Sequence, residues 1–238
     1  MAKNLPIKLF RKRDNDKLPN LIPGGGAEGN KFKLQGEALS IRAAYLRTYF
    51  GSLEPKIKNK IEDENYLPTI VKLKLNDEAL AKSYRGEIGK IFDFGRKMNI
   101  IGMIGENQLL VKIDNESDLS QIEKRLSEID KNTLGISAVE EVENFTPIIN
   151  AAETEEANLK VRLVNYKDYK LNEIAERSFE KLCEQLGVKY QKLNYTKDLI
   201  LYRVSKISPQ GISNFNESES IFSISNIPLI KLAKGDLP

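Results

Sequence analysis

The stretch that decides the fold is Ile70-Val71-Lys72-Leu73-Lys74-Leu75, in which apolar residues alternate with lysines. A period of two indicates a strand with one face in a core and the other in water. Apolar residues then recur every three or four positions over residues 77–91, which predicts a helix. Two short apolar runs around Gly105 predict a hairpin. A second helix with Ser117 as its N-cap, and a closing strand over residues 135–145, complete the pattern.

The same order of elements occurs twice, in residues 69–147 and again in residues 159–232. Strand, helix, strand, strand, helix, strand is the signature of a ferredoxin-like unit, an antiparallel four-stranded sheet covered on one face by two helices. In the second copy, Gly187 is placed for a left-handed helix cap and Ser208-Pro209 for a helix start. We therefore expect an α+β fold of two tandem ferredoxin-like (βαββαβ) units with antiparallel sheets. That fold alone does not determine a function.

An N-terminal arm and a helical segment precede the two repeats. Residues 1–35 contain Gly24-Gly25-Gly26 and eight Lys or Arg against three acidic residues, which is typical of an extended segment without a core. From Gly36 a helical pattern begins that Pro55 is expected to break. Its broad apolar face is expected to comprise Ala38, Ile41, Tyr45, Leu46, Tyr49, Phe50 and Leu53. The expected divisions are an extended basic arm (1–35), a helical segment (36–66), a first ferredoxin-like domain (67–149), a polar linker (150–158), a second ferredoxin-like domain (159–232) and a tail (233–238).

The composition favours a reducing environment without a membrane. The chain has 238 residues and a formal net charge of +3. No apolar stretch approaches the roughly 20 residues that a membrane span requires. The first residues lack the apolar core of a signal peptide. The single Cys183 excludes an internal disulfide and, at a helical position, is expected to be a small core residue. We expect a cytoplasmic location.

The residue types argue against catalysis. The chain contains no histidine, so no Ser-His-Asp or Cys-His arrangement can be built from it. One cysteine cannot supply a zinc site of Cys and His ligands. The adjacent pairs Glu140-Glu141 and Glu155-Glu156 are typical of solvated charge, and Gly24-Gly25-Gly26 lacks the Lys-Ser/Thr of a phosphate loop. We expect no catalytic, metal or cofactor site in these residues.

Three consecutive segments carry a resemblance to a known family. They are Gln108-Leu109-Leu110-Val111-Lys112-Ile113, a helix through Leu126, and Leu134-Gly135-Ile136-Ser137-Ala138-Val139-Glu140-Glu141-Val142-Glu143. They resemble the second half of a subtilisin propeptide, in which a strand and a helix are followed by a last strand rich in Val and Glu. Phe145-Thr146-Pro147 stands where that family has a proline-bearing tail.

The N-terminal half is similar to a narrower group as well. The likeness rests on Asn4-Leu5-Pro6-Ile7-Lys8-Leu9-Phe10 with the later Gly24-Gly25-Gly26, on Leu67-Pro68-Thr69-Ile70-Val71-Lys72-Leu73-Lys74-Leu75 and on Ala79-Leu80-Ala81-Lys82-Ser83-Tyr84-Arg85. These stretches look like the N-terminal regions of large intracellular bacterial subtilisin-like serine proteases. The likeness covers residues 4–147 and thins out in the second repeat.

The resemblance implies a non-catalytic propeptide-like module that acts as a folding chaperone and inhibitor. Such propeptides place their sheet against the catalytic domain and run a C-terminal tail through the substrate cleft as an added strand. The partner would be a subtilisin-like catalytic domain, in cis or in trans. The Asp, His and Ser motifs of the family are missing, so the resemblance implies either the N-terminal part of a longer protease or a free-standing inhibitor-like protein. We favour the first, in which a protease domain would follow Pro238. The tail residues expected to occupy the cleft are Leu229, Ile230, Leu232, Ala233 and Leu237.

A tandem RNA-binding or protein-interaction module is the alternative. RNA-recognition modules display stacking aromatics on the two central strands of the same kind of sheet. The strand at residues 70–75 has no aromatic, and residues 108–113 lack the basic-Gly-aromatic pattern of such modules. Tyr190 and Tyr202 in the second repeat are candidates for base stacking, although strand tyrosines usually pack. The basic residues that this alternative assigns to nucleic-acid contact are Lys8, Arg11, Lys12, Arg13 and Lys17.

Overall fold

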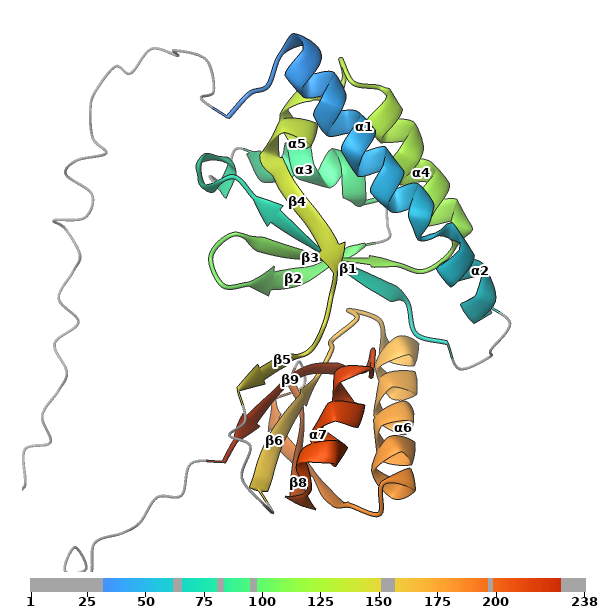
Figure 1. Cartoon of the computed structure of the whole chain (residues 1–238), viewed down its shortest axis with the longest axis vertical. Helices are drawn as coiled ribbons and strands as arrows, with labels where there is room; N and C mark the ends of the chain where they lie inside the picture. Colours follow the sequence, from blue (N-terminus) through green and yellow to red (C-terminus); the bar gives the residue numbers. More distant parts are fainter. Residues whose placement is uncertain are drawn as a thin grey trace, which may run out of the picture. The chain divides into compact units, whose positions relative to one another are not determined.

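Two mainly antiparallel sheets and the helices on them form a mixed α and β fold (Figure 1). The computed structural model describes residues 32–61, 66–80, 84–94, 98–150, 157–196 and 199–227, and all of them belong to one compact unit. The arm predicted for residues 1–35 therefore lies outside the described residues, apart from its last four. Within the described part of the chain, no helix is long and apolar enough to cross a membrane.

The first sheet has the strand order β2-β3-β1-β4, and each neighbouring pair is antiparallel. Its strands are β1 (Thr69–Leu75), β2 (Ile100–Ile104), β3 (Gln108–Ile113) and β4 (Val139–Asn144). The helices of this half are α1 (Gly36–Ser52), α2 (Glu54–Ile61), the short 3₁₀ helix η1 (Asp77–Leu80), α3 (Arg85–Phe92), α4 (Glu116–Ser127) and α5 (Thr133–Ala138). The predicted strand at residues 70–75 and the hairpin around Gly105 are confirmed.

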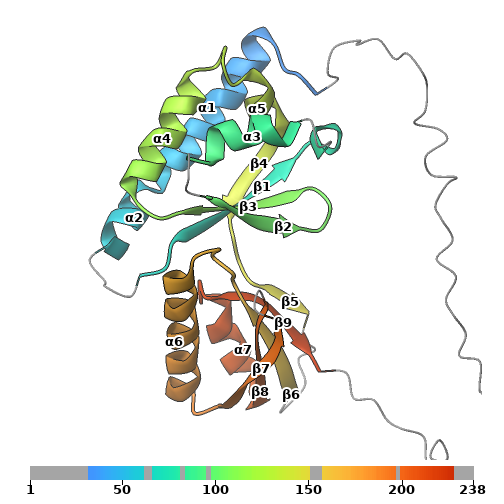
Figure 2. The same cartoon turned by 180° about the vertical axis from the view of Figure 1, so that it is seen from behind.

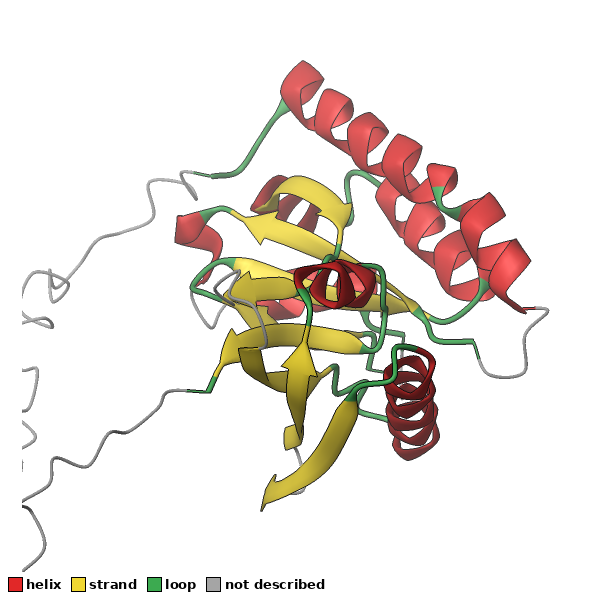
Figure 3. Ribbon diagram, turned by 60° about the horizontal axis from the view of Figure 1, so that its bottom comes forward, coloured by secondary structure: helices red, strands yellow, loops and turns green. Residues whose placement is uncertain are grey.

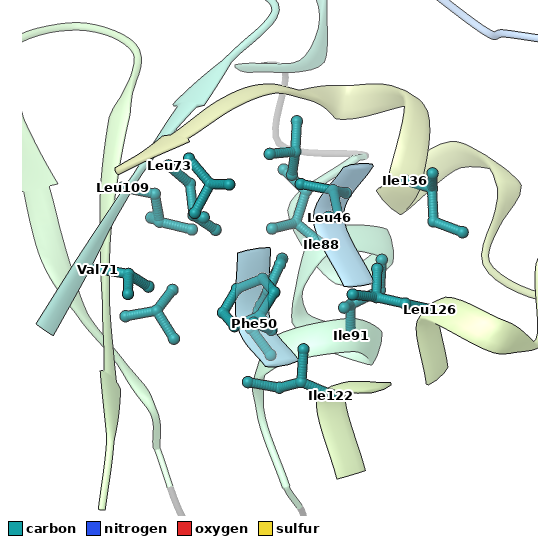
Figure 4. Packing of buried hydrophobic residues seen from close by; sticks show 14 of the residues in the cluster. Leu46, Phe50, Val71, Leu73, Ile88, Ile91, Leu109, Ile122, Leu126 and Ile136 are labelled. Atoms are coloured by element: carbon teal, nitrogen blue, oxygen red, sulfur yellow. The ribbon is translucent and has the colours of Figure 1, made fainter. Parts of the chain in front are cut away.

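The core of this half lies between the sheet and its helices (Figure 4). Phe50 of α1 is fully buried between Val71 of β1 and the helix residues Ile91 and Ile122. The helices α1 and α4 run side by side on this face in both Figure 1 and Figure 2. Alternate residues of β1 point toward this core, as their period of two predicts.

The apolar face predicted for α1 is only partly correct. Ile41 and Tyr45 are 62% and 42% exposed, whereas the buried positions are Leu39, Ala43, Leu46 and Phe50. The spacing alone permitted two adjacent stripes, and contact with α4 and α5 selects one of them. The predicted break near Pro55 is confirmed: α1 ends at Ser52, and the separate short helix α2 carries Pro55 in its first turn, where a missing N–H costs nothing.

Two helices of the first repeat differ from the prediction. The N-cap of α4 is Asn115 rather than Ser117, since the Asn115 side chain accepts a hydrogen bond from the Asp118 N–H at 3.1 Å. The helix predicted over residues 77–91 is divided into η1 and α3. The Asn76 side chain accepts from the Glu78 N–H, and Asp77 accepts from the Asn107 side chain, which holds the start of this segment in a tight turn.

The closing strand of the first repeat begins later than predicted. Residues 135–138 belong to the helix α5, and β4 begins only at Val139. Gly135 packs so closely against α3 that a Cβ there would lie 2.5 Å from the carbonyl oxygen of Glu87. Ser137 also donates to the Thr133 carbonyl at 2.7 Å. These contacts give the short apolar run a helical rather than an extended conformation.

The second sheet has the order β5-β9-β6-β8-β7, with β5 parallel to β9 and the other pairs antiparallel. Figure 3 draws the strands of both sheets in yellow and the helices in red. Its elements are β5 (Ile148–Asn150), β6 (Ala157–Leu163), α6 (Tyr169–Gln185), β7 (Lys189–Thr196), β8 (Leu199–Ile207), α7 (Pro209–Asn216) and β9 (Ile221–Asn226). Both predicted caps are confirmed: Gly187 follows α6 with a φ of 64°, and Ser208 accepts a hydrogen bond from the Gly211 N–H at 3.2 Å.

A third cluster of buried residues joins the two repeats. Ile70 and Leu110 of the first sheet belong to it together with Val164 and Tyr166 of the second repeat. The Tyr166 hydroxyl donates to the Glu219 carbonyl at 3.0 Å. The face of the first sheet that carries no helices therefore packs against the second repeat.

Candidate functional site

The residues predicted to occupy a protease cleft are not among those that the structure describes. Leu229, Ile230, Leu232, Ala233 and Leu237 all follow the last described residue, Ile227. The N–H of Ile227 donates to the Asn158 carbonyl at 3.2 Å, so the described chain ends beside the start of β6. Within the described residues, the candidate binding surfaces are the sheet faces that carry no helices and the free edges of the two sheets. We call the face of each sheet without helices its open face.

The open face of the first sheet is covered by the second repeat, and its lysines are paired with acidic residues. Its apolar residues Ile70 and Leu110 are buried in the cluster shared with the second repeat. Lys72 and Lys74 of β1 form ion pairs with glutamates of β4 at 2.6 and 2.9 Å. Lys112, which is 4% exposed, pairs with an aspartate two residues on. This face offers little surface or charge to a further partner.

The open face of the second sheet carries exposed positive charge. Leu159 and Val161 of β6 are buried against α6 and α7, so the alternating Lys160 and Arg162 point to the opposite side. All of the strands β5 to β9, as the structure describes them, lack aspartate and glutamate. We define the basic face by its four exposed cations, Lys160, Arg162, Lys189 and Arg203.

The tyrosines that the sequence offered for base stacking lie on the other side of this sheet. Tyr202 is fully buried against the helices; its hydroxyl donates to Glu180 at 2.7 Å and also lies 3.2 Å from a carboxylate oxygen of Glu176. Burial raises the pKa of Tyr202 well above its ordinary value, and the bond to Glu180 raises it further. Tyr190 packs on the same core. These two rings are packing residues.

One aromatic ring on the basic face is already in contact with other groups. The guanidinium of Arg162 lies 4.4 Å from the centroid of the Phe222 ring. Phe145 stacks on Phe222 with a centroid distance of 5.8 Å. These contacts place the Arg162 charge beside the junction of the two repeats and leave Phe222 poorly placed to stack on a ligand.

The free edge of β4 is closed by side chains of α1. Arg42 donates to the Val139 carbonyl. The Tyr45 hydroxyl accepts from the Val142 N–H at 3.3 Å and lies 3.4 Å from its carbonyl oxygen. Such contacts occupy the backbone groups through which another strand could add. Sequence reasoning missed this arrangement, because it placed Tyr45 on the apolar face of the predicted helix.

Beside the edge strand β2 lies an apolar groove of about 530 Å³. It is lined in part by Leu80, Ile88 and Ile100, and by two exposed methionines, Met98 at 62% and Met103 at 44%. Sequence reasoning missed this groove, because it forms where η1 and α3 meet the sheet edge. Its chemistry suits apolar groups in general.

Groups with chemical reactivity are few in the described part of the chain. Cys183 is buried, and that burial raises the pKa of its thiol to about 12, which keeps it protonated and unreactive. Glu140 accepts from the Asn76 side chain at 2.9 Å, and Glu141 pairs with Lys74. In the part of the chain that the structure describes, no three His, Cys, Asp or Glu side chains are grouped so that they could hold a metal ion.

Comparison with known proteins gives no family for this chain. No protein-family model matches it, and no curated protein sequence is similar enough to count as a match.

Proposed function

We propose that the chain is a non-catalytic, propeptide-like module that binds the catalytic domain of a subtilisin-like serine protease. The observation that supports it is the connectivity of the first repeat, where the likeness to subtilisin propeptides was found. There the chain runs β1-α3-β2-β3-α4-β4 and gives the strand order β2-β3-β1-β4. We take each repeat as a ferredoxin-like unit, since β6 to β9 repeat the same order, with β5 added at the edge.

The docking unit in this proposal is the second repeat. The open face of the first sheet already packs against the second repeat through Ile70 and Leu110. The open face of the second sheet is exposed, and its strand β9 leads directly to Ile227, after which the predicted tail follows. A tail that enters the substrate cleft as a strand would gain affinity from main-chain hydrogen bonds. In this arrangement one repeat supplies both the docking face and the tail.

The test is inhibition of a purified cognate catalytic domain by the intact chain and by a chain that lacks Pro228–Pro238. We expect the truncated chain to inhibit at least about tenfold more weakly, because main-chain pairing in the cleft is lost. Its thermal unfolding, followed by circular dichroism, should match that of the intact chain, since a terminal extension contributes little to a core. Equal inhibition by the two chains would contradict the role given to the tail.

Nucleic-acid binding is the second candidate, and the basic face is the observation that favours it. If it holds, affinity for single-stranded RNA should fall steeply with salt. Replacement of Lys8, Arg11, Lys12 and Arg13 by alanine then distinguishes binding by the arm from binding by the face. Salt-sensitive RNA binding without any protease inhibition would refute the propeptide-like function.

A further inference from the structure

Basic residues at equivalent positions of the two sheets have acidic partners in the first sheet but not in the second. In the first sheet, Lys72 and Lys74 of β1 lie opposite Glu143 and Glu141 of β4 in the register of the antiparallel pair. Both lysines form ion pairs with these glutamates. Opposite charges at facing positions stabilise a sheet, so the cations of this face serve the fold itself.

In the second sheet the same positions lack an acidic partner. Lys160 and Arg162 of β6 lie opposite Ser225 and Ser223 of β9. The strand β6 begins its repeat as β1 does, and β9 ends its repeat as β4 does. Serines therefore stand where the first repeat has glutamates, and the two cations are not neutralised by the neighbouring strand.

The other neighbour adds a further cation. Lys160 also lies directly opposite Arg203 of β8, and both side chains are exposed. Like charges at facing positions of an antiparallel pair destabilise the sheet. The strands around Lys160 and Arg203 contain no acidic residue that could neutralise the pair. These two positive charges therefore do not stabilise the fold. Departures of this kind from local consistency are expected at binding surfaces.

We propose that the basic face docks an acidic surface of a partner protein. The inference rests on the proposed function and names the chemistry of the partner: a patch of Asp and Glu on a folded domain. Charge complementarity supports this occupant. Single-stranded nucleic acid is less well suited, because sites for it combine basic residues with exposed aromatic rings on which the bases stack. Tyr190 and Tyr202 face the helices, and Phe222 is covered by Arg162 and Phe145.

The test compares two double variants of equal net charge. K160E/R203E reverses the charge at the centre of the face and leaves the Arg162–Phe222 contact in place. The control, K170E/K181E, reverses two exposed lysines on α6, on the other side of the sheet. Binding is measured with labelled poly-L-glutamate, single-stranded RNA and the cognate catalytic domain, each at several salt concentrations. Circular dichroism establishes that both variants are folded.

We expect K160E/R203E to weaken binding of poly-L-glutamate and of the catalytic domain by about tenfold or more, within the range that electrostatic steering covers, and to flatten the salt dependence. The control should bind as the unmodified chain does. If poly-L-glutamate binds through the face but the catalytic domain never binds, the acidic-partner inference holds and the propeptide-like function fails.

Three results would overturn the inference. One is a catalytic domain that binds the face variant and the control equally, which leaves the propeptide-like function standing. Another is RNA binding that is tighter than poly-L-glutamate binding and is lost in K160E/R203E. The third is a gain in poly-L-glutamate affinity when Glu153, Glu155 and Glu156 are replaced by glutamine, which would assign the face to the chain's own linker.

Discussion

Replacement of Gly135 by alanine tests the contact between α5 and α3 that gives residues 135–138 their helical conformation. An added Cβ would lie 2.5 Å from the Glu87 carbonyl oxygen and 2.7 Å from the Ile91 side chain, whereas ordinary contact begins at 3.4 Å. One helix must therefore move by about 0.9 Å, and Ile91 is fully buried and cannot yield easily. Overpacking of this kind costs about 1–3 kcal/mol.

The matched control is G86A in α3, where a Cβ would meet no atom within 4 Å. Alanine is favoured over glycine in a helix by about 1 kcal/mol, and this gain applies to both variants. The difference between them therefore reports the overpacking alone. In urea unfolding followed by circular dichroism, G135A should be about 1–3 kcal/mol less stable than G86A, with an unchanged denaturant slope. If G135A were as stable as G86A, the close packing of α5 on α3 would be wrong.

Three further predictions concern other parts of the fold. V142D introduces a charge at a position that is 5% exposed and should lower the free energy of unfolding by at least about 3 kcal/mol. The control E143Q changes a side chain that is 62% exposed, and its free energy of unfolding should stay within about 1 kcal/mol of the unmodified chain. A V142D variant with native-like stability would contradict the burial of this face of β4. Burial raises the pKa of the Cys183 thiol from 9.0 to about 12, so its contribution to stability is complete below pH 9 and is lost as the pH rises from 9 toward 12. The unmodified chain should thus lose more free energy of unfolding than C183A between about pH 8 and about pH 10, and equal losses would refute the assignment. Limited proteolysis should cut before Gly36 and within residues 151–156, and the fragments from the second cut should elute together on size exclusion, because β5 stays paired with β9; separation of the fragments would contradict that pairing.

The sequence was informative where a local pattern and the tertiary contacts agree. Alternation identified β1 and β6, and the caps at Gly187 and Ser208 were predicted from residue type alone. Residues 135–138 were misassigned, because a short apolar run suits a strand or a helix equally and the contact with Glu87 decides between them.

The candidate site shows the same limit. Lys160 and Arg162 stand out in the sequence as polar residues of a strand, but so do Lys72 and Lys74. Only the register distinguishes the pairs, because it brings glutamates opposite one pair and serines opposite the other. The strand β5 has three residues, too few for a period to be recognised.

The pairing of β5 with β9 sets an order of events during synthesis. Ile148 and Ile149 leave the ribosome directly after the first repeat, yet their partners Ser223 and Ile224 are among the last described residues to be made. The core of the first repeat can therefore form before the partner strand of β5 has been synthesised. A nascent chain arrested before Ile221 therefore leaves β5 without its partner strand, and an unpaired strand edge of this kind is a template for aggregation.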